Sequence, residues 1–468
     1  MFIFFLFTTY TYIGSIHFIY EFVYDKLKSL DNKIKLKVNS FNKMNSAVDV
    51  IIIGAGISGL YAAYQIKHFS PSNTTFLILE KAKKQWMGGR TGNESFYGAD
   101  VVTGAGIGRK NKDRALIQLL KHTKTLYSEF TTSRNYVPPF QPIDLMGAIR
   151  KLKVEYKKTP EKHCHKTFKQ FFLEVFDASV YKHFVLTTGY TDFENADIYE
   201  TLYHYGMDDN VSGWTGLGIP WKRLVGTLYT KIGKEHFKFS SEVSRIRTVQ
   251  ESPCRLFEVT TSDNKSYYSN KVVVATTINA VRKIVPGASS RTSVYQQIRS
   301  QAFLLVYAKF DRKSAEVMKK YVTTFTSLHG PLQKMIPTDP SKGVYMIAYT
   351  DNRHAMALKT KGALENTRAN CEMYSKWIET ALGIPLEDRG LTILAIKDYY
   401  WPEGTHYYEP LSTSSKFKNR VEFIHEAQHP EKGMVVVGEM VSRHQGWVEG
   451  ALESVDMVLN KEWLNTVV

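Results

Sequence analysis

The sequence is poor in cysteine and contains no internal repeat and no low-complexity linker. Its three cysteines, Cys164, Cys254 and Cys371, are isolated and odd in number. This set excludes a disulfide framework and favours a reducing compartment. Cys164 stands between two histidines, but no second ligand pair lies near it in the sequence, so we expect no metal site. The chain has 468 residues and is 43% hydrophobic, enough for a large core and more than one domain.

Positive charge exceeds negative charge without being concentrated in one arm. The net charge is +16, and a basic stretch at 150–169 also contains Glu155 and Glu161. Basic patches can bind phosphate backbones, but no nucleic-acid-binding fold or stacking motif accompanies this one. We therefore expect a solvated helical face and no nucleic-acid partner. Attraction to an anionic membrane surface or a polyanion is the alternative.

The first 43 residues differ from the rest. Residues 1–20 carry no formal charge and are long enough to cross a bilayer as a helix. Lysines follow them, so the positive-inside rule would keep the body of the protein in the cytoplasm. Three interpretations stay open: a membrane anchor, a true start at Met44 directly before the first predicted strand, and a cleaved signal.

An apolar β-branched run followed by Gly54, Gly56 and Gly59 is the most informative feature of the chain. The run predicts a strand buried on both faces. The glycines permit a tight turn, a close approach to a pyrophosphate, and packing of the next helix on the strand. A second predicted strand, 76–79, ends on Glu80, where a carboxylate can accept ribose hydroxyls. The pattern predicts a dinucleotide whose phosphates lie at a helix N-terminus.

The triplet Gly88-Gly89-Arg90 indicates which dinucleotide is bound. Nicotinamide-binding domains do not need it. In one large flavoprotein superfamily it extends the fingerprint, with glycines close to the cofactor and the arginine reaching the phosphates. Alone, the triplet could be a glycine turn before a surface arginine. Behind the complete fingerprint it predicts FAD.

Later segments supply further strands of the same domain. Strand patterns recur at 242–247, 257–259, 271–277 and 434–439. The last of these leads into 446–454, which is typical of a turn that opens a helix. Such a helix start can direct N–H groups at the flavin, with Glu439 placed to accept ribityl hydroxyls.

Taken in order, these motifs resemble the flavin-containing amine oxidases, which include monoamine, polyamine and L-amino-acid oxidases and flavin-dependent histone demethylases. The resemblance covers most of residues 48–468. It implies hydride transfer from the carbon beside an amine to flavin N5, hydrolysis of the resulting imine, and reoxidation by dioxygen to give hydrogen peroxide. The implied cofactor contacts are Gly54, Gly56, Ser58, Gly59, Glu80, Lys81, Gly89, Arg90, Gly104, Ala105, Val243, Gly438, Glu439 and Val448.

The resemblance also implies aromatic rings that guide the amine over the flavin. Trp447 occupies one of the family's two ring positions. On the other side, the Trp401–Tyr408 segment places His406 where an aromatic ring often stands, with Tyr407 next to it. Such rings supply apolar contact and cation–π attraction, which gives these three residues their implied catalytic role. The alternative is that the aromatic residues only pack.

Two departures from the family pattern matter. Many members carry a lysine that holds a water against flavin N5, and the matching position, five before Phe310, is Leu305. This puts efficient oxidase turnover in doubt. Members with covalently bound flavin use a cysteine where this chain has Thr405, so FAD should be non-covalent.

The sequence does not indicate which substrate the protein binds. L-amino-acid oxidases need an arginine for the carboxylate, and Arg109 lies near the region where one can enter, although a phosphate-facing or surface role fits equally. A polyamine oxidase would want carboxylates. The acidic residues available in the predicted substrate domain are Glu194, Asp197, Asp208 and Asp209.

The sequence therefore predicts an α/β protein with a discontinuous Rossmann-like FAD domain and a mixed α+β substrate domain. We place the FAD domain at 44–120, 215–290 and 425–468, and the substrate domain at 121–214 and 291–424. The predicted activity is FAD-dependent oxidation of an amine or amino acid. The alternatives are isoprenoid desaturation or porphyrinogen oxidation in the same superfamily, or a flavoprotein without turnover that acts as a binding module. The oligomeric state is not indicated.

Overall fold

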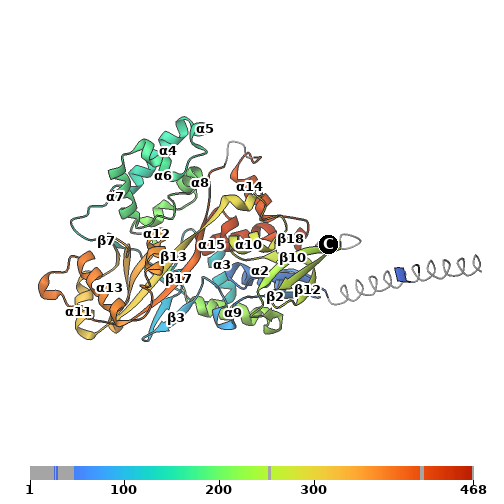
Figure 1. Ribbon diagram of the computed structural model, residues 1–468, viewed down its shortest axis with the longest axis horizontal. Coiled ribbons are helices and arrows are strands. Elements are labelled where there is room, and N and C mark those ends of the chain that lie inside the picture. The colour runs from blue at the N-terminus through green and yellow to red at the C-terminus, as the bar shows by residue number, and fades with distance from the viewer. Residues whose placement is uncertain (1–25, 27, 30–46, 251–254, 412–415, 466–468) are drawn as a thin grey trace, which may run out of the picture.

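The computed structural model describes residues 26, 28–29, 47–250, 255–411 and 416–465 (Figure 1). The predicted anchor at 1–20 and Cys254 lie outside these residues. Within the described part, no helix is long and apolar enough to cross a membrane. Of the two described cysteines, Cys164 is exposed and Cys371 is buried, and both are free thiols.

The larger sheet has the strand order β10-β11-β12-β1-β2-β9, and β18 also pairs with β12. Strands β1, β2, β9, β12 and β18 are linked by parallel pairing, whereas β10 and β11 add an antiparallel extension. The bounds are β1 (Val48–Ile53), β2 (Phe76–Leu79), β9 (Phe237–Lys238), β10 (Val243–Gln250), β11 (Leu256–Thr261), β12 (Ser266–Val274) and β18 (Met434–Val436).

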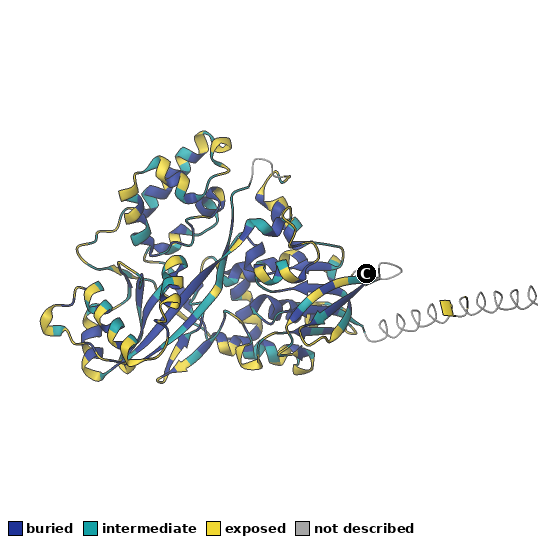
Figure 2. Cartoon of the chain, in the orientation of Figure 1, coloured by how far each residue is buried: buried dark blue, intermediate teal, exposed yellow. Residues whose placement is uncertain are grey.

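Helices cover both faces of this sheet. They have to, because apolar side chains along β1 point alternately to one face and the other. Val50 and Ile52 pack on one face with helices α2, α3, α9, α15 and α16. Ile51 and Ile53 point to the other face, which α10 and α14 cover. Figure 2 shows this interior as continuously buried. The bounds are α2 (Ile57–Phe69), α3 (Arg114–Thr123), α9 (Trp221–Ile232), α10 (Ile278–Ile284), α14 (Arg420–Gln428), α15 (Val448–Val458) and α16 (Lys461–Asn465).

The second sheet has the order β17-β13-β16-β15-β14-β7 and is antiparallel except for the β14–β7 pair. One face of β13, including Leu304 and Val306, packs against helices α11, α12 and α13. The opposite face, including Leu305, packs against the β3–β4 hairpin. The bounds are β3 (Asn93–Phe96), β4 (Ala99–Val102), β7 (Arg134–Tyr136), β13 (Ile298–Phe310), β14 (Phe325–Ser327), β15 (Lys334–Asp339), β16 (Val344–Asp351), β17 (Ile393–Tyr408), α11 (Arg312–Tyr321), α12 (Asn352–Thr360) and α13 (Arg368–Ala381).

A group of helices with a phenylalanine-rich core stands beside the second sheet, at the top of Figure 1. Phe168, Phe172 and Phe184 are fully buried there and lie in mutual ring contact. The helices are α4 (Leu145–Lys158), α5 (Pro160–His163), α6 (Phe168–Val175), α7 (Ala178–Thr188) and α8 (Ile198–Tyr203). A small sheet of β5 (Gly108–Arg109), β6 (Ser128–Thr131) and β8 (Thr215–Gly218) links this region to the rest.

Strand ends differ from the predicted patterns where the chain turns toward the site. The strand predicted at 434–439 ends at Val436, because Gly438 adopts φ +128° and a short 3-10 turn, η7 (Glu439–Val441), begins there. The strand predicted at 271–277 ends at Val274. The larger sheet lies within the ranges predicted for the FAD domain and the second sheet within those for the substrate domain. The domain boundaries themselves stay a prediction.

Candidate cofactor site and substrate cavity

The parallel strands β1, β2 and β18 place functional residues at one edge of the larger sheet. Gly54 follows β1, Glu80 follows β2, and Gly438 stands two residues after β18. Since all three strands run in the same direction, these residues meet at the carboxyl edge, where open α/β sheets bind their ligands.

The three fingerprint positions require glycine for different physical reasons. Gly54 adopts φ +103°, and a Cβ there would lie 2.3 Å from the Ala275 carbonyl oxygen. A Cβ on Gly59 would lie 2.0 Å from the Gly54 carbonyl oxygen. A Cβ on Gly56 would meet nothing within 4 Å, and no side chain caps the α2 N-terminus that Gly56 begins. Gly54 and Gly59 thus permit packing, whereas Gly56 borders open space suited to an anion.

Glu80 lies across the same edge. Its Oε2 accepts a hydrogen bond from the Ala55 N–H at 2.6 Å and its Oε1 accepts one from the Ala82 N–H at 2.8 Å. A carboxylate offers about four acceptor positions, so capacity for ribose hydroxyls remains. Lys81 is the exposed residue that follows Glu80.

The Gly-Gly-Arg triplet lies directly on the fingerprint loop. The Gly88 N–H donates to the Ala55 carbonyl at 2.9 Å, and Gly88 forms a bridge with Gly56. A Cβ on Gly104 would lie 2.2 Å from the Arg90 carbonyl oxygen, which also accepts the Ala105 N–H at 2.8 Å. Gly104 and Ala105 therefore fix the backbone of Arg90.

Arg90, Glu439 and His406 form a network between this edge and the second sheet. Glu439 Oε1 accepts hydrogen bonds from Arg90 Nη1 at 2.8 Å and from His406 Nδ1 at 2.5 Å. Its Oε2 accepts the Gly446 N–H at 3.0 Å. Burial alone would raise the pKa of Glu439, but His406 and Arg90 hold that pKa well below its usual range. Glu439 is therefore ionised at neutral pH.

Helix α15 supplies the second helix N-terminus of the site. Trp447 is its N-cap residue, and no side chain caps this end. Val448 is its first residue, and Ser454 Oγ accepts the Gly438 N–H at 2.8 Å. Glu449 instead caps α3, since its two carboxylate oxygens accept the N–H groups of residues 115 and 116 at 2.8 and 3.0 Å.

Arg109 is fully engaged in a buried charge cluster. Its guanidinium contacts Asp113 at 2.6 Å and Asp209 at 2.8 Å. It also lies 3.8 Å from the ring centroid of Trp447. The predicted role for Arg109 in binding a substrate carboxylate would require that it leave these partners, so the geometry favours a supporting contact to Trp447.

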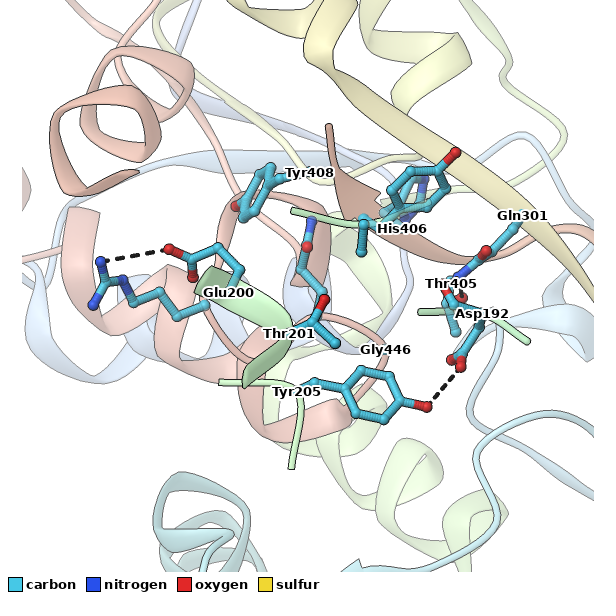
Figure 3. Close-up of a pocket in the computed structure, with 13 residues that line it drawn as sticks. Asp192, Glu200, Thr201, Tyr205, Gln301, Thr405, His406, Tyr408 and Gly446 are labelled. Carbon is cyan, nitrogen blue, oxygen red and sulfur yellow. Dashed lines mark hydrogen bonds and ion pairs between the residues drawn. The ribbon is translucent and has the colours of Figure 1, made fainter. Parts of the chain in front are cut away.

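A cavity opens where His406 on β17 meets residues on and around α8 (Figure 3). It encloses about 430 Å³ of space not filled by protein, including its opening. The predicted residues His406 and Tyr407 line it. The other lining residues are Asp192, Ala196, Glu200, Thr201, Tyr205, Gln301, Thr405, Tyr408, Arg443, Gln445 and Gly446.

Leu305 lies on the face of β13 that packs on the β3–β4 hairpin. It is 2% exposed and contacts an apolar cluster that includes Val101 and Tyr399. Lys309 lies near the end of the same strand and donates to the Lys342 carbonyl at 2.5 Å. The described residues therefore provide no lysine on β13 at the position where the family pattern expects one.

The sequence profile of flavin-containing amine oxidoreductases matches residues 57–454. The chain belongs to this family. Among solved structures, a cyclohexylamine oxidase from Brevibacterium oxydans IH-35A is similar at 16% identity and a TM-score of 0.67, over 88% of this chain and 97% of that one. A putrescine oxidase double mutant is similar at 14% identity and a TM-score of 0.67, over 87% and 97%. No curated protein sequence matches.

These comparisons confirm the family resemblance and the α/β fold with its separate mixed sheet. The family implies a flavin cofactor. The residues at the carboxyl edge fit FAD, because two uncapped helix N-termini, the open space at Gly56 and the carboxylate of Glu80 lie together. Val243, the remaining predicted contact, is buried at the start of β10. The individual contacts stay predictions.

Sequence reasoning missed the charged residues of the cavity. Asp192 precedes α8, Glu200 lies on it, and Arg443 lies in the loop before α15. The acidic candidates named from sequence have other partners: Asp197 pairs with Arg420, and Asp209 pairs with Arg109. No local motif distinguishes these two groups.

Proposed function

We propose that the protein binds FAD non-covalently and oxidises an amine or amino acid. The network of Arg90, Glu439 and His406 carries this proposal, because it joins the predicted cofactor edge to the wall of the cavity. FAD, when bound, accepts a hydride from the carbon beside the amine and passes two electrons to dioxygen, giving an imine and hydrogen peroxide.

The residues of this chain would hold the cofactor at both ends. The N-terminus of α2 and the Arg90 guanidinium would face its phosphates, and the N-terminus of α15 would direct its N–H groups at the flavin. Glu80 would accept the ribose hydroxyls. Glu439, kept ionised by Arg90 and by the hydrogen bond from His406, would orient His406 and accept ribityl hydroxyls.

The cavity residues would hold the amine and remove its proton. Tyr205, Tyr407 and Tyr408 give the wall apolar surface that excludes water. A hydride leaves only from a neutral amine, so the ammonium form must lose a proton first. Asp192 can accept that proton, because burial and the charge of Asp351 raise the pKa of Asp192.

Two other activities compete with this proposal. The first is desaturation or porphyrinogen oxidation in the same superfamily, which the apolar cluster around Leu305 would suit. The second is a flavoprotein without turnover, which would suit a chain that has Leu305 where the family pattern expects a lysine. The carboxylates in the cavity favour an amine over a neutral lipid.

Purified full-length protein tests the proposal directly. We expect a flavin absorption spectrum that is released as free FAD on denaturation, anaerobic bleaching by at least one amine or amino acid, and peroxide release in air. Bound flavin that no monoamine, polyamine or L-amino acid bleaches would refute amine oxidation. Protein-bound colour after denaturation would refute non-covalent attachment.

A further inference from the structure

Lys334 is a fully buried lysine on β15, a different strand from the one that contains Leu305. Its Nζ donates to the Gly189 carbonyl oxygen at 2.5 Å. The same atom lies 3.2 Å from the ring centroid of Tyr190 and 4.5 Å from that of Tyr349. Burial of a lysine destabilises a protein unless its charge is paired, so this position implies charged partners for Lys334.

Asp351, a fully buried carboxylate at the end of β16, holds the segment that follows α7. Its Oδ2 accepts the Thr191 N–H at 2.8 Å, and its Oδ1 accepts the Thr191 hydroxyl at 2.6 Å. Gln333, the neighbour of Lys334 in the sequence, donates to Oδ1 at 3.3 Å and accepts the Asp351 N–H at 2.8 Å. Asp351 is therefore bonded both to the second sheet and to the segment after α7.

Residues 189–192 carry Asp192 from the end of α7 to the wall of the cavity. Lys334 holds the first of these residues and Asp351 holds the third, so both act directly before Asp192. Asp192 Oδ1 accepts the Tyr205 hydroxyl at 2.6 Å, a bond drawn in Figure 3. Neither Lys334 nor Asp351 is among the residues that line the cavity. The two residues thus act on the proposed proton acceptor from outside the cavity.

The charges of Lys334 and Asp351 act on Asp192 in opposite directions. Burial and then the charge of Asp351 raise the pKa of Asp192, whereas the tyrosine hydrogen bond and the charge of Lys334 lower it. Burial lowers the pKa of Lys334, and the charges of Asp351 and Asp192 oppose that effect. Because the three groups interact, their titration belongs to the cluster, and removal of one charge must change it.

Other titratable groups surround these three. The positive charge of Arg134 on β7 acts on Lys334, and His354 on α12 lies in the field of Asp351. Burial raises the pKa values of three neighbouring tyrosines, which stay neutral: Tyr190, Tyr205 and Tyr349. Asp192 shares the cavity lining with three further titratable residues, Glu200, His406 and Arg443. All of these groups are kept in the variants below, so a difference between two proteins reports the residue that was changed.

We propose that Lys334 and Asp351 are positioning residues for the proton transfer, which together hold residues 189–192 and set the charge of Asp192. In the step that they support, one N–H bond of the substrate's ammonium group breaks and its electron pair stays on nitrogen. The proton bonds to a carboxylate oxygen of Asp192. This inference rests on the proposed function and makes it more specific.

The pH profile of kcat/KM tests the inference, with the amine that the wild type uses best. Lys334→Met keeps an unbranched side chain but removes the positive charge, so Asp192 should stay protonated to higher pH. We expect the acid limb to move to higher pH, with kcat/KM reduced about tenfold more at about pH 6 than on the high-pH plateau. Asp351→Asn removes the negative charge and keeps an oxygen for the Thr191 N–H. The acid limb of this variant should move to lower pH.

A second measurement needs no turnover. Infrared spectra of the flavin-free protein record the protonated carboxyl group of Asp192, whose band is assigned by its loss in Asp192→Asn. As pH rises, this band should persist longer in Lys334→Met than in the wild type and disappear earlier in Asp351→Asn.

Lys309→Met is the matched control. Lys309 also donates to a backbone carbonyl, that of Lys342 at 2.5 Å, but it lies near the end of β13 and does not line the cavity. Its substitution should leave both the acid limb and the infrared band where the wild type has them. The ionisation of the free amine is the same for every protein, so it does not contribute to these differences.

The outcomes separate the inference from the proposed function. Opposite movements in Lys334→Met and Asp351→Asn support the inference, because a purely structural loss lowers kcat/KM equally at every pH. Limbs that stay in place, or that move in the same direction, overturn it and leave amine oxidation intact. If Lys334→Met does not fold, the direction observed in Asp351→Asn decides alone. Infrared bands that move as expected in a protein whose flavin no amine bleaches would refute the proposed function, while the control of the Asp192 charge would stand.

Discussion

Two glycines of one fingerprint should respond in opposite ways to the same substitution. Gly59→Ala places a Cβ 2.0 Å from the Gly54 carbonyl oxygen and 3.0 Å from its carbonyl carbon. Both atoms are backbone, so the helix must move by more than an ångström. Overpacking costs about 1–3 kcal/mol. The gain in helix propensity returns about 1 kcal/mol, so we expect the free energy of unfolding to fall by up to about 2 kcal/mol.

Gly56→Ala should leave that free energy nearly unchanged. Its Cβ meets no protein atom within 4 Å, and its φ of −70° suits alanine, so loss of stability should stay below about 1 kcal/mol. The added methyl group enters the space where we expect the pyrophosphate. FAD affinity should therefore fall at least about tenfold, or about 1.4 kcal/mol.

Urea unfolding of the flavin-free protein and titration with FAD measure the two quantities separately. If Gly56→Ala bound FAD as tightly as wild type, the assignment of this open space to phosphate would be refuted. If Gly59→Ala were as stable as Gly56→Ala, the packing argument would fail.

The other predictions concern Trp447, Arg109 and Glu200. Trp447→Ala should retain FAD but lower kcat/KM for the preferred amine about tenfold, because it removes the ring that the family resemblance places against the substrate. Normal kinetics would show that Trp447 makes no such contact. Arg109→Gln removes the guanidinium that pairs with the buried Asp113, while Asp209 keeps Lys112 at 2.7 Å, and it should reduce the free energy of unfolding by about 3–5 kcal/mol. Arg368→Gln, in an exposed pair, should not change that free energy measurably. If the two substitutions lowered the free energy of unfolding in urea equally, the argument from the buried charge cluster would be refuted. Because the pKa of Glu200 is raised from 4.5 to about 7 in the folded protein, the native state binds more protons there, so flavin-free protein should lose stability as pH rises across that window. Glu200→Gln should flatten this dependence, and an unchanged slope would show that Glu200 is not its source.

The core of the larger sheet could be predicted because its signals are local. Strand β2 begins and ends where the sequence predicts, at Phe76 and Leu79, since an apolar run bounded by a turn and a glutamate marks both ends. The last strand was predicted to reach Glu439 but stops at Val436, because the positive φ of Gly438 redirects the chain and hydrophobicity does not encode that turn.

Partners of charged residues could not be predicted. The sequence placed Arg90 at phosphates and Glu439 at ribityl hydroxyls, yet the two side chains contact each other across 349 positions of the chain. Arg109 was considered for a substrate carboxylate, but Asp209, 100 positions away, pairs with it. Charge pairing depends on which segments the fold brings together, and the spacing of residues along the sequence does not predict this.

The same limit explains why the sequence indicates the cofactor more specifically than it indicates the substrate. Glycines such as Gly54 and Gly59 are fixed by backbone contacts that any FAD-binding relative must repeat, so a sequence pattern identifies them. Glu200 is recognisable only by a deficiency, two buried oxygens that lack a donor, and this appears only after α8 and the loop before α15 are packed together. A buried carboxylate of this kind must be found in the folded structure, because no local pattern of residue types marks it.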